Sequence, residues 1–543
     1  MASFANLIPE NQGGNYGGER YDLKIGLSRF HIFAMSHETV RAAIISSLNW
    51  TMRFSQADRR RMGGGMVEKM LKFTVTPRTT PEKRGADLRA GDFHEIYRDF
   101  IDAKAAEQAS RCSQCGVPFC QTHCPLHNNI PDWLRMTAEG RLREAYDLSQ
   151  ATNAMPEICG RICPQDRLCE GNCVIEQSGH GTVTIGAVER YLSDKAWDEG
   201  WVRPLVASSD RGQSVGIVGA GPAGLAAAER LRELGYGVTV YDRHDRPGGL
   251  LVYGIPGFKL EKDVVERRTR RLADGGVQYV LDFEVGRDAS LADLRQRHDS
   301  VLIATGVYKA RDMSVPGAGS AGVVAALDYL VASNRKGMGD AVPCFDDGRL
   351  DAAGKAVVVV GGGDTAMDCV RTAVRQGATS VTCLYRRDRA NMPGSDREVS
   401  HAEEEGVVFE WLAAPRSVTG EALAAAGIKA ARMRLGPPDA SGRQAPEEIE
   451  GGDFDLNADL VIKALGFDPE NLPEAFGVPD LAVTRWGTVK TDLRNLMTSI
   501  PGVFAAGDIV RGASLVVWAI RDGQDAAAAM HRYMSAHALA GVA

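Results

Sequence analysis

The sequence has no run of about 18 consecutive apolar residues, so no segment predicts a helix that spans a membrane. It also has no excess of positive charge. The 63 Lys and Arg stand against 70 Asp and Glu, and the net charge of −7 argues against nucleic acid as a partner. No signal peptide is apparent either. We therefore expect a cytoplasmic protein that binds neither nucleic acid nor membrane.

The composition is otherwise that of a large globular protein. Hydrophobic residues make up 44% and charged residues 24% of the 543 residues, which is typical of folded domains. This length leaves room for roughly three or four domains. Glycine is frequent, with 60 residues, and this predicts several tight turns of the kind that bind phosphate groups.

Cysteine is unevenly distributed, because eight of the 11 cysteines lie in two short runs. Each run contains a Cys-Pro step, as ferredoxin-like iron–sulfur sequences do. Eight thiolates are enough for two four-iron clusters. The runs are Cys112-x2-Cys115-x4-Cys120-x3-Cys124-Pro125 and Cys159-x3-Cys163-Pro164-x4-Cys169-x3-Cys173.

Two other uses of these cysteines are weaker. Zinc is often held by Cys-x2-Cys pairs, but the spacings after Cys115 do not repeat the paired pattern of a zinc ribbon. Disulfides are disfavoured because nothing indicates export from the cell. The spacing therefore favours iron–sulfur clusters.

Residues 1–65 differ from the rest of the chain. They carry 8 Lys and Arg against 5 Asp and Glu, a net of +3, so the remainder carries −10. One hypothesis is that they are not native coding sequence and that Met66 or Met70 is the true start. The alternative is a disordered or loosely docked basic tail.

Residues 66–205 are predicted to form a small helical domain around the cysteines. Apolar residues recur at helical spacing across Ile130–Gln150, and Gly186–Trp197 is a second helical stretch. We expect the clusters to hold this domain together.

At Ser214 the pattern changes to a strand, a glycine turn, a helix and a second strand. Val215–Val218 precedes the turn Gly219-Ala220-Gly221-Pro222-Ala223-Gly224, the helix Leu225–Leu234 and the strand Val238–Tyr241. In such a dinucleotide-binding unit, Gly219 permits the turn, Gly221 lets a pyrophosphate approach, and Gly224 lets helix and strand pack closely.

Asp242 ends this unit and indicates which nucleotide it binds. It lies 23 residues after Gly219, where a carboxylate accepts a hydrogen bond from a ribose hydroxyl. FAD and NAD offer a free 2′-hydroxyl, whereas the carboxylate would repel a 2′-phosphate.

A second unit repeats the pattern but ends with the opposite charge. The strand Ala356–Val360 leads into Gly361-Gly362-Gly363-Asp364-Thr365-Ala366 and a helix through Val374, and the strand Ser380–Tyr385 ends at Arg386 and Arg387. Paired guanidinium groups suit a phosphate, which favours NADPH over NADH. The alternative is a solvated basic turn over Arg386–Arg389, near Asp388.

Two further segments indicate a flavin. Val301–Gly306 is a strand that runs into Thr305 and Gly306, and Gly502–Asp508 is a strand that runs into Gly507 and Asp508. Both are similar to motifs of two-dinucleotide-binding flavoproteins, although Asp508 could instead cap a helix over Leu515–His531. A flavin is also needed because it accepts a hydride from NADPH and releases single electrons to clusters.

The fold class predicted is therefore multidomain, with a small α-helical iron–sulfur domain followed by an α/β double-Rossmann flavoprotein fold. Its flavin domain is split by the inserted nucleotide domain. The expected boundaries are 1–65 for the extension, 66–205 for the [4Fe-4S] domain, 206–335 and 466–543 for the FAD domain, and 336–465 for the NADPH domain.

The order of these parts, with three phrases, resembles a known family. The phrases are Ser110–Cys120 (SRCSQCGVPFC), Cys124–Pro131 (CPLHNNIP) and Gly254–Leu260 (GIPGFKL). The resemblance is to the flavoprotein family of glutamate synthase beta subunits and the dihydropyrimidine dehydrogenase N-terminal half, over about residues 70–543. It implies FAD contacts at Gly249, Leu250 and Lys259 as well.

The resemblance also implies that the two cysteine runs interleave. One cluster would take the first three cysteines of run one and the last of run two, namely Cys112, Cys115, Cys120 and Cys173. The other would take Cys124, Cys163, Cys169 and, as a fourth ligand, Glu189. Cys159 is then a bystander, although it remains the alternative ligand, and Glu189 is otherwise a surface helix residue.

The activity implied is that of the NADPH-oxidising small subunit of glutamate synthase. Electrons would pass from NADPH to FAD, to two [4Fe-4S] clusters and to a large (alpha) subunit that makes two L-glutamate from L-glutamine and 2-oxoglutarate. A hetero-oligomer is expected. Other interpretations are an electron-transfer subunit for ferredoxin, sulfide or dihydropyrimidine, and a non-catalytic NADP-sensing subunit. A thioredoxin-reductase-like enzyme is disfavoured because Cys344, Cys369 and Cys383 are isolated.

Overall fold

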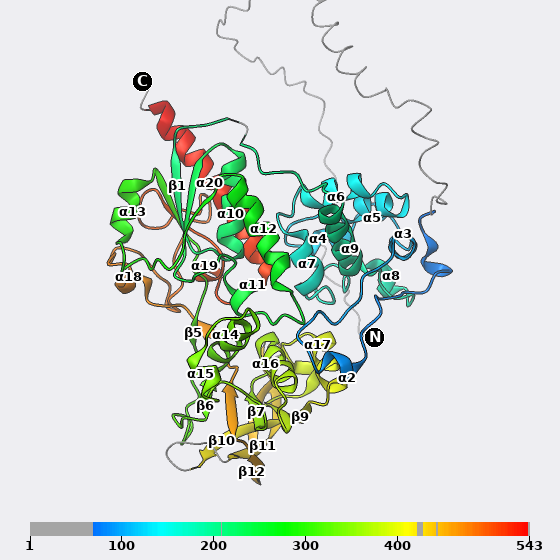
Figure 1. The fold of residues 1–543 in the computed structure, drawn as a ribbon. Coiled ribbons are helices and arrows are strands. Elements are labelled where there is room, and N and C mark those ends of the chain that lie inside the picture. The colour runs from blue at the N-terminus through cyan, green and yellow to red at the C-terminus, as the bar shows by residue number, and fades with distance from the viewer. Residues whose placement is uncertain (1–68, 208, 421–426, 441, 443, 541–543) are drawn as a thin grey trace, which may run out of the picture. The chain divides into compact units, whose positions relative to one another are not determined.

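The computed structural model describes residues 69–207, 209–420, 427–440, 442 and 444–540. All of them belong to one compact unit that runs from Val67 to Ala543 (Figure 1). The expectations for residues 1–65 lie outside the described residues. No helix in the described part of the chain combines the length and apolar character needed to cross a membrane.

Short helices surround both cysteine runs, which confirms the expected helical domain. The pattern over Ile130–Gln150 forms two helices, because Gly140 adopts a φ of 74° between them. Trp133 is fully buried at the centre, and its indole N–H donates to Asn128 Oδ1 at 2.9 Å. The elements are the 3₁₀ turn η2 (Lys72–Thr74), α2 (Ala86–Arg89), α3 (Asp102–Ala109), α4 (Phe119–Thr122), α5 (Ile130–Ala138), α6 (Leu142–Gln150), α7 (Pro156–Ile162), α8 (Val174–Gln177) and α9 (Ile185–Asp198).

The first nucleotide unit is a parallel five-stranded sheet of order β15-β4-β1-β2-β3. The strands β1, β4 and β15 are almost wholly buried, as expected where helices cover both faces, whereas β3 at one edge is more exposed. Its strands are β1 (Ser214–Val218), β2 (Gly237–Tyr241), β3 (Gln278–Val280), β4 (Ser300–Ile303) and β15 (Val503–Ala505). Its helices are α10 (Pro222–Glu233), α11 (Leu250–Tyr253), α12 (Lys262–Asp274), α13 (Leu291–Arg297), α18 (Leu472–Ala475), α19 (Asp508–Arg511) and α20 (Val516–Ala540).

The second unit repeats this sheet with the order β6-β13-β7-β8-β9, again parallel. The expected start of this unit at residue 336 falls after β6 and near the end of α14, although both elements belong to the unit: β6 pairs with β13, and α14 contributes Tyr329 and Leu330 to its core. The elements are β6 (Val323–Ala325), α14 (Ala326–Gly337), α15 (Pro343–Asp346), β7 (Ala356–Val360), α16 (Asp364–Arg375), β8 (Ser380–Tyr385), the 3₁₀ turn η3 (Arg389–Asn391), α17 (Asp396–Glu404), β9 (Val408–Trp411) and β13 (Leu460–Lys463).

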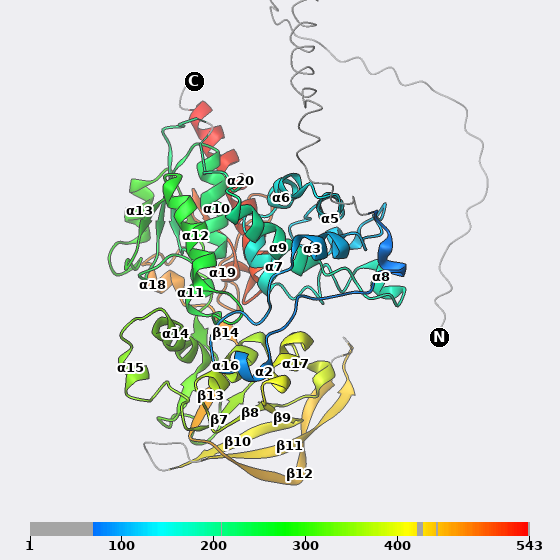
Figure 2. The ribbon, with the colours of Figure 1, turned by 45° about the vertical axis from the view of Figure 1, so that its right-hand side comes forward.

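Two smaller sheets complete the fold. An antiparallel sheet of β10 (Ala413–Thr419), β11 (Gly427–Pro438) and β12 (Gln444–Asn457) is inserted before β13, and Figure 2 shows it beneath the second unit. The strands β5 (Lys309–Ala310) and β14 (Phe467–Asp468) pair antiparallel where the chain enters and leaves the second unit. This pairing marks the junction between the two nucleotide units.

One apolar core is shared between the helical domain and the first sheet. It includes Leu126, Ile158 and Cys163 from the helical domain and Ile520 from α20. The helix α20 packs along α10 (Figure 1), and Gly523 permits the crossing, because a Cβ there would lie 2.1 Å from the Ala223 carbonyl oxygen. The helical domain is therefore continuous with the first nucleotide unit.

Candidate cofactor-binding sites

A crevice opens at the carboxyl ends of β1, β2 and β4. Two adjoining cavities form it and share Gly219, Asp242, Thr305 and Tyr308 in their walls. Dinucleotides bind at this place in open α/β sheets. Nine of the residues predicted for FAD line the crevice: Gly219, Gly221, Pro222, Ala223, Asp242, Leu250, Thr305, Gly306 and Asp508.

The glycines of the first turn have the backbone roles that the sequence predicts. Gly219 adopts a φ of 112°, and a Cβ on it would lie 2.3 Å from the Ala304 carbonyl oxygen. A Cβ on Gly224 would lie 2.0 Å from the Gly219 carbonyl oxygen, whereas Gly221 faces open space. The turn therefore presses against β4 and α10 and leaves room on the side of the crevice.

Polar groups in the crevice lack protein partners or are held in place by the turn. Asp242 accepts hydrogen bonds from the Ala220 amide at 2.6 Å and the His244 amide at 2.9 Å. The hydroxyl of Thr305 is buried with no hydrogen-bond partner among the described residues. Burial raises the pKa of Asp508 to about 7. Buried groups of this kind need a partner, so the residues present fit a ribose- and phosphate-bearing cofactor.

The other residues predicted for FAD lie outside the walls of the crevice. Gly249 packs on Gly221 and Gly507 packs on Ala223, so both support the crevice from behind. Lys259 is elsewhere: its ammonium lies 2.8 Å from Asp368 Oδ1 of α16, and it lines a different cavity. The structure does not bring Lys259 to the crevice.

Sequence reasoning missed other residues of the crevice wall, among them Arg243, Tyr308 and Glu470. Arg243 lies over the Tyr308 ring at 4.6 Å and donates to Glu470 at 2.9 Å. Arg243 and Tyr308 follow Asp242 and Gly306 closely along the chain, which could have indicated them. Glu470 comes from the segment that returns from the second unit, and no local pattern marks it.

The second glycine turn sits at the carboxyl end of β7. Asp364 begins α16, and its carboxylate accepts the Ser395 amide at 3.0 Å. Gly363 faces open space, and Thr365 and Ala366 form the first turn of the helix. The amide groups of this helix start are suited to phosphate.

Two arginines follow β8 at the same edge of the sheet. Arg386 is exposed, and neither Arg386 nor Arg387 makes a side-chain hydrogen bond or ion pair with any described residue. Arg389 differs, because it donates to Asp396 and Glu403 of α17. Asp388 caps the following turn through the Asn391 amide. The guanidinium groups of Arg386 and Arg387 are thus not neutralised by this turn and suit a phosphate.

The side chains of Cys112, Cys115, Cys120 and Cys173 lie close enough together for their charges to act on one another. Burial raises the pKa of Cys112 to about 11 and that of Cys120 to about 12, and the charges of Cys173 and Cys115 contribute to both shifts. The Gln114 side chain also donates to Cys112 Sγ at 3.3 Å. The closeness of these four thiols suits a shared iron–sulfur cluster.

The second set comprises Cys124, Cys163, Cys169 and Glu189, with Cys159 beside them. Burial raises the pKa of Glu189 to about 8, and its carboxylate contributes to the raised pKa of Cys124, Cys163 and Cys169. Glu189 accepts a hydrogen bond from Asn153 Nδ2 at 3.2 Å. The interpretation of Glu189 as a surface helix residue is wrong, because it is 9% exposed.

Cys159 lies within this second set but has partners of its own. Its Sγ is 3.7 Å from Asn153 Oδ1, and a hydrogen bond with Cys163 raises the pKa of Cys159 well above its usual range. All 11 cysteines are free. Among the described residues, no three His, Cys, Asp or Glu side chains are close enough to hold a single metal ion.

The two sets differ in what they pack against. Cys159 and Cys163 belong to the core shared with the first sheet, and the Pro125 carbonyl, next to Cys124, accepts from Arg521 of α20 at 3.2 Å. Cys112 and Cys173 belong to the core of the helical domain itself. The second set therefore touches the core of the first sheet through Cys163 and Cys124, whereas Cys169 packs on the helical-domain core.

Comparisons with known proteins distinguish an iron–sulfur part from a nucleotide-binding part of the chain. Residues 89–201 match the family model described as dihydropyrimidine dehydrogenase domain II, 4Fe-4S cluster. Residues 213–523 match the pyridine nucleotide-disulphide oxidoreductase family. The structure of Mycobacterium tuberculosis FprA in complex with NADPH matches with a TM-score of 0.52 at 20% identity, over 61% of this chain and 86% of that one. That likeness shows the fold, which confirms the predicted double-Rossmann architecture.

Two curated relatives match nearly over their whole length. The glutamate synthase [NADPH] small chain of Azospirillum brasilense is 67% identical over 476 residues, which cover 88% of this chain and 98% of the relative. That of Escherichia coli strain K12 is 45% identical over 467 residues, 85% of this chain and 98% of the relative. The chain belongs to the family of glutamate synthase [NADPH] small chains.

Proposed function

We propose that this chain is the electron-input subunit of a glutamate synthase. It oxidises NADPH, and its electrons reach a large subunit that makes two L-glutamate from L-glutamine and 2-oxoglutarate. The observation that carries the proposal is the shared core, which joins the second cysteine set directly to the helix that borders the crevice. Such a link suits a protein in which electrons leave a flavin for iron–sulfur centres.

The crevice residues would hold FAD. Asp242 is placed for a ribose hydroxyl, the turn at Gly221 for the pyrophosphate, and Thr305 and Asp508 for the polar groups between. FAD supplies the conversion of a two-electron hydride into single electrons. The protein contributes binding and burial, since the crevice walls shield the site with Tyr308, Leu250 and Val516.

Two [4Fe-4S] clusters account for the two cysteine sets. Cys112, Cys115, Cys120 and Cys173 would hold one cluster, and Cys124, Cys163, Cys169 and Glu189 the other. A carboxylate ligand changes the charge of a cluster and hence its potential. Cys159 is proposed to support the second site without binding iron.

The second unit would bind NADPH. The turn Gly361–Gly363 and the start of α16 would face the pyrophosphate. Arg386 and Arg387 would bind the 2′-phosphate, which NADH lacks. Asp364 holds the Ser395 amide and so braces the loop beside the turn.

The partner proposed is the large (alpha) subunit of glutamate synthase, in a hetero-oligomer. A cytoplasmic location is expected for such an enzyme. The identity of 67% to the small chain of Azospirillum brasilense favours this partner over ferredoxin, sulfide or dihydropyrimidine.

The test uses the purified chain under anaerobic conditions. About eight iron and one FAD per chain are expected, and NADPH should bleach the flavin absorbance. Adding a glutamate synthase large subunit with glutamine and 2-oxoglutarate should then give NADPH-dependent glutamate. Bleaching of the flavin without glutamate formation would favour another electron acceptor. A purified chain that contains no flavin would contradict the proposal.

A further inference from the structure

Three consecutive residues of the helical domain contact the loop 393–395 of the second unit and the start of α17. Arg167 Nη1 and Nη2 donate to the carbonyl oxygens of Pro393 and Gly394, each at 2.5 Å. Gln165 Oε1 accepts from Arg397 at 2.8 Å, and the Asp166 carboxylate accepts the Ser395 hydroxyl at 3.4 Å. Segments more than 220 residues apart in the sequence are thus joined.

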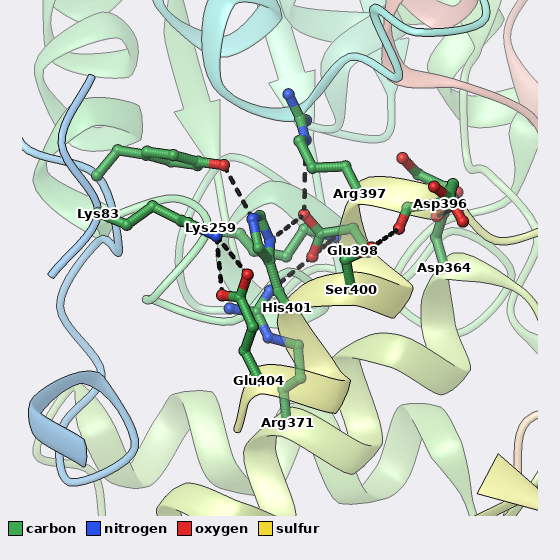
Figure 3. Close-up of polar contacts among 12 residues, drawn as sticks. Lys83, Lys259, Asp364, Arg371, Asp396, Arg397, Glu398, Ser400, His401 and Glu404 are labelled. Carbon is green, nitrogen blue, oxygen red and sulfur yellow. Dashed lines mark hydrogen bonds and ion pairs between the residues drawn. The ribbon is translucent and has the colours of Figure 1, made fainter. Parts of the chain in front are cut away.

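The loop that Arg167 contacts is itself seated on the second glycine turn. The Gly394 amide donates to the Gly362 carbonyl at 2.8 Å, and the Ser395 amide donates to Asp364 at 3.0 Å. Gly394 and Ser395 are both buried. Figure 3 shows Asp364 next to Asp396 at the start of α17. Any movement of this loop therefore changes the surroundings of the turn.

The contacting residues lie between Cys163 and Cys169, and Gln165 is held there by hydrogen bonds of its backbone and its side chain. The Gln165 carbonyl accepts the amides of Glu170 and Gly171 at 2.9 and 3.0 Å. Its side-chain amide donates to the carbonyls of Cys159 and Gly160. Gln165 is only 2% exposed. Because Gln165 is hydrogen-bonded through both its backbone and its side chain, this segment can fix the position of the loop 393–395.

We propose that Arg167 is a positioning residue for the nicotinamide nucleotide. It acts from the helical domain and holds the loop 393–395 against the turn that faces the pyrophosphate. The inference rests on the proposed function in one respect, namely that the second unit binds NADPH. Beyond the proposed function, the inference links the segment between Cys163 and Cys169 to the nucleotide site.

The geometry explains why an arginine serves here. A planar guanidinium offers two parallel N–H groups, so it can hold two successive carbonyls of a turn in one orientation. A lysine ammonium at the same place would keep the charge and one contact but lose the fixed fork. A hydrogen bond from a charged donor stabilises a contact more than a bond from a neutral donor. Arg167 is exposed, and solvent therefore reduces the stabilisation that its two bonds give.

The test compares Arg167→Ala with wild-type protein that carries its FAD and iron. The dissociation constant for NADP⁺ is measured by anaerobic titration, and flavin reduction by NADPH is followed by stopped flow. We expect the dissociation constant to rise about three- to tenfold, with the limiting reduction rate within about twofold of wild type. Arg167→Lys should recover part of the affinity.

Two matched variants separate loop positioning from other effects. Lys83→Ala removes another contact to the second unit, the pair with Glu404 at the far end of α17, and Arg141→Ala removes ion pairs confined to the helical domain. Both should bind NADP⁺ as wild type does. Equal affinity in Arg167→Ala and wild type would overturn the inference, and so would an equal loss in Lys83→Ala.

Two further results keep the test decisive. If Arg167→Ala loses iron, the comparison is made on Arg167→Lys, whose unchanged affinity would equally overturn the inference. Wild-type protein that fails to bind NADP⁺ would instead contradict the proposed function.

Discussion

Arg268 of α12 and Glu157 of α7 form an ion pair in which both side chains are fully buried. Two hydrogen bonds of 2.7 and 2.8 Å join them in a fork. The pair crosses from the first nucleotide unit to the helical domain, next to the second cysteine set. It favours one orientation of the two parts, since separating them would leave each buried charge without its hydrogen-bonded counter-charge.

Removing one member of this pair should destabilise the protein strongly. Glu157→Ala leaves the Arg268 guanidinium buried without its counter-charge, and we expect a loss of about 3–5 kcal/mol. The loss would be measured as a lower midpoint in urea, followed by circular dichroism.

The same helix offers a matched control. Arg270 and Glu266 also pair on α12, but both are exposed, and Glu266→Ala should change the stability by under about 1 kcal/mol. A Glu157→Ala midpoint equal to that of Glu266→Ala would show that burial does not make this pair structurally important.

The nucleotide units could be predicted from local sequence because their signals are local. The strand, turn and helix around Gly219 and around Gly361 lie within about 30 residues each, and Asp242 and Arg386 follow at fixed distances. The close packing of Gly224 on Gly219 also follows from the motif itself.

Features set by distant contacts could not be predicted in this way. β6 joins the second sheet only through β13, which lies about 140 residues further on. Lys259 belongs to a phrase of the first unit, but domain packing directs it to Asp368. The segment at Arg167 meets Pro393 only in the folded chain.

Replacing Glu189 and Cys159 in turn should identify the eighth iron ligand. Glu189→Ala should lose about half of the iron, because it removes a proposed ligand of the second cluster. Cys159→Ala should keep all of it. The measurement is iron content with the electron paramagnetic resonance spectrum of the reduced protein.

A buried cysteine away from both sets provides the control. Cys383 lies in the core of the second sheet, and Cys383→Ala should keep full iron. Loss of iron in Cys159→Ala with retention in Glu189→Ala would reverse the assignment.

Removing Arg386 should weaken the preference for NADPH over NADH. The variant Arg386→Ala loses a charge-assisted contact to the 2′-phosphate, so the KM for NADPH should rise about tenfold or more, whereas the KM for NADH should change little. Steady-state kinetics with a dye acceptor measures both.

The neighbouring arginine serves as the comparison. Arg389 is engaged with Asp396 and Glu403, and Arg389→Ala should leave the preference within about threefold of wild type. An equal rise of both KM values in Arg386→Ala would contradict a role in binding the 2′-phosphate.

Acid should destabilise the second unit through Glu405. Burial alone would raise its pKa, but hydrogen bonds from Arg375 and Arg371 lower it to about 2, against an ordinary value of 4.5. A lowered pKa adds stability above pH 4.5 that is lost as the pH falls toward 2, in total about 3 kcal/mol. Glu405→Gln should therefore be less stable at pH 7 and lose less stability between pH 5 and pH 3.

Urea midpoints across this range measure how steeply the stability falls with pH. The exposed neighbour Glu403 provides the control, because Glu403→Gln should keep the wild-type slope of stability against pH. A slope in Glu405→Gln as steep as that of wild type would show that the acid sensitivity arises elsewhere.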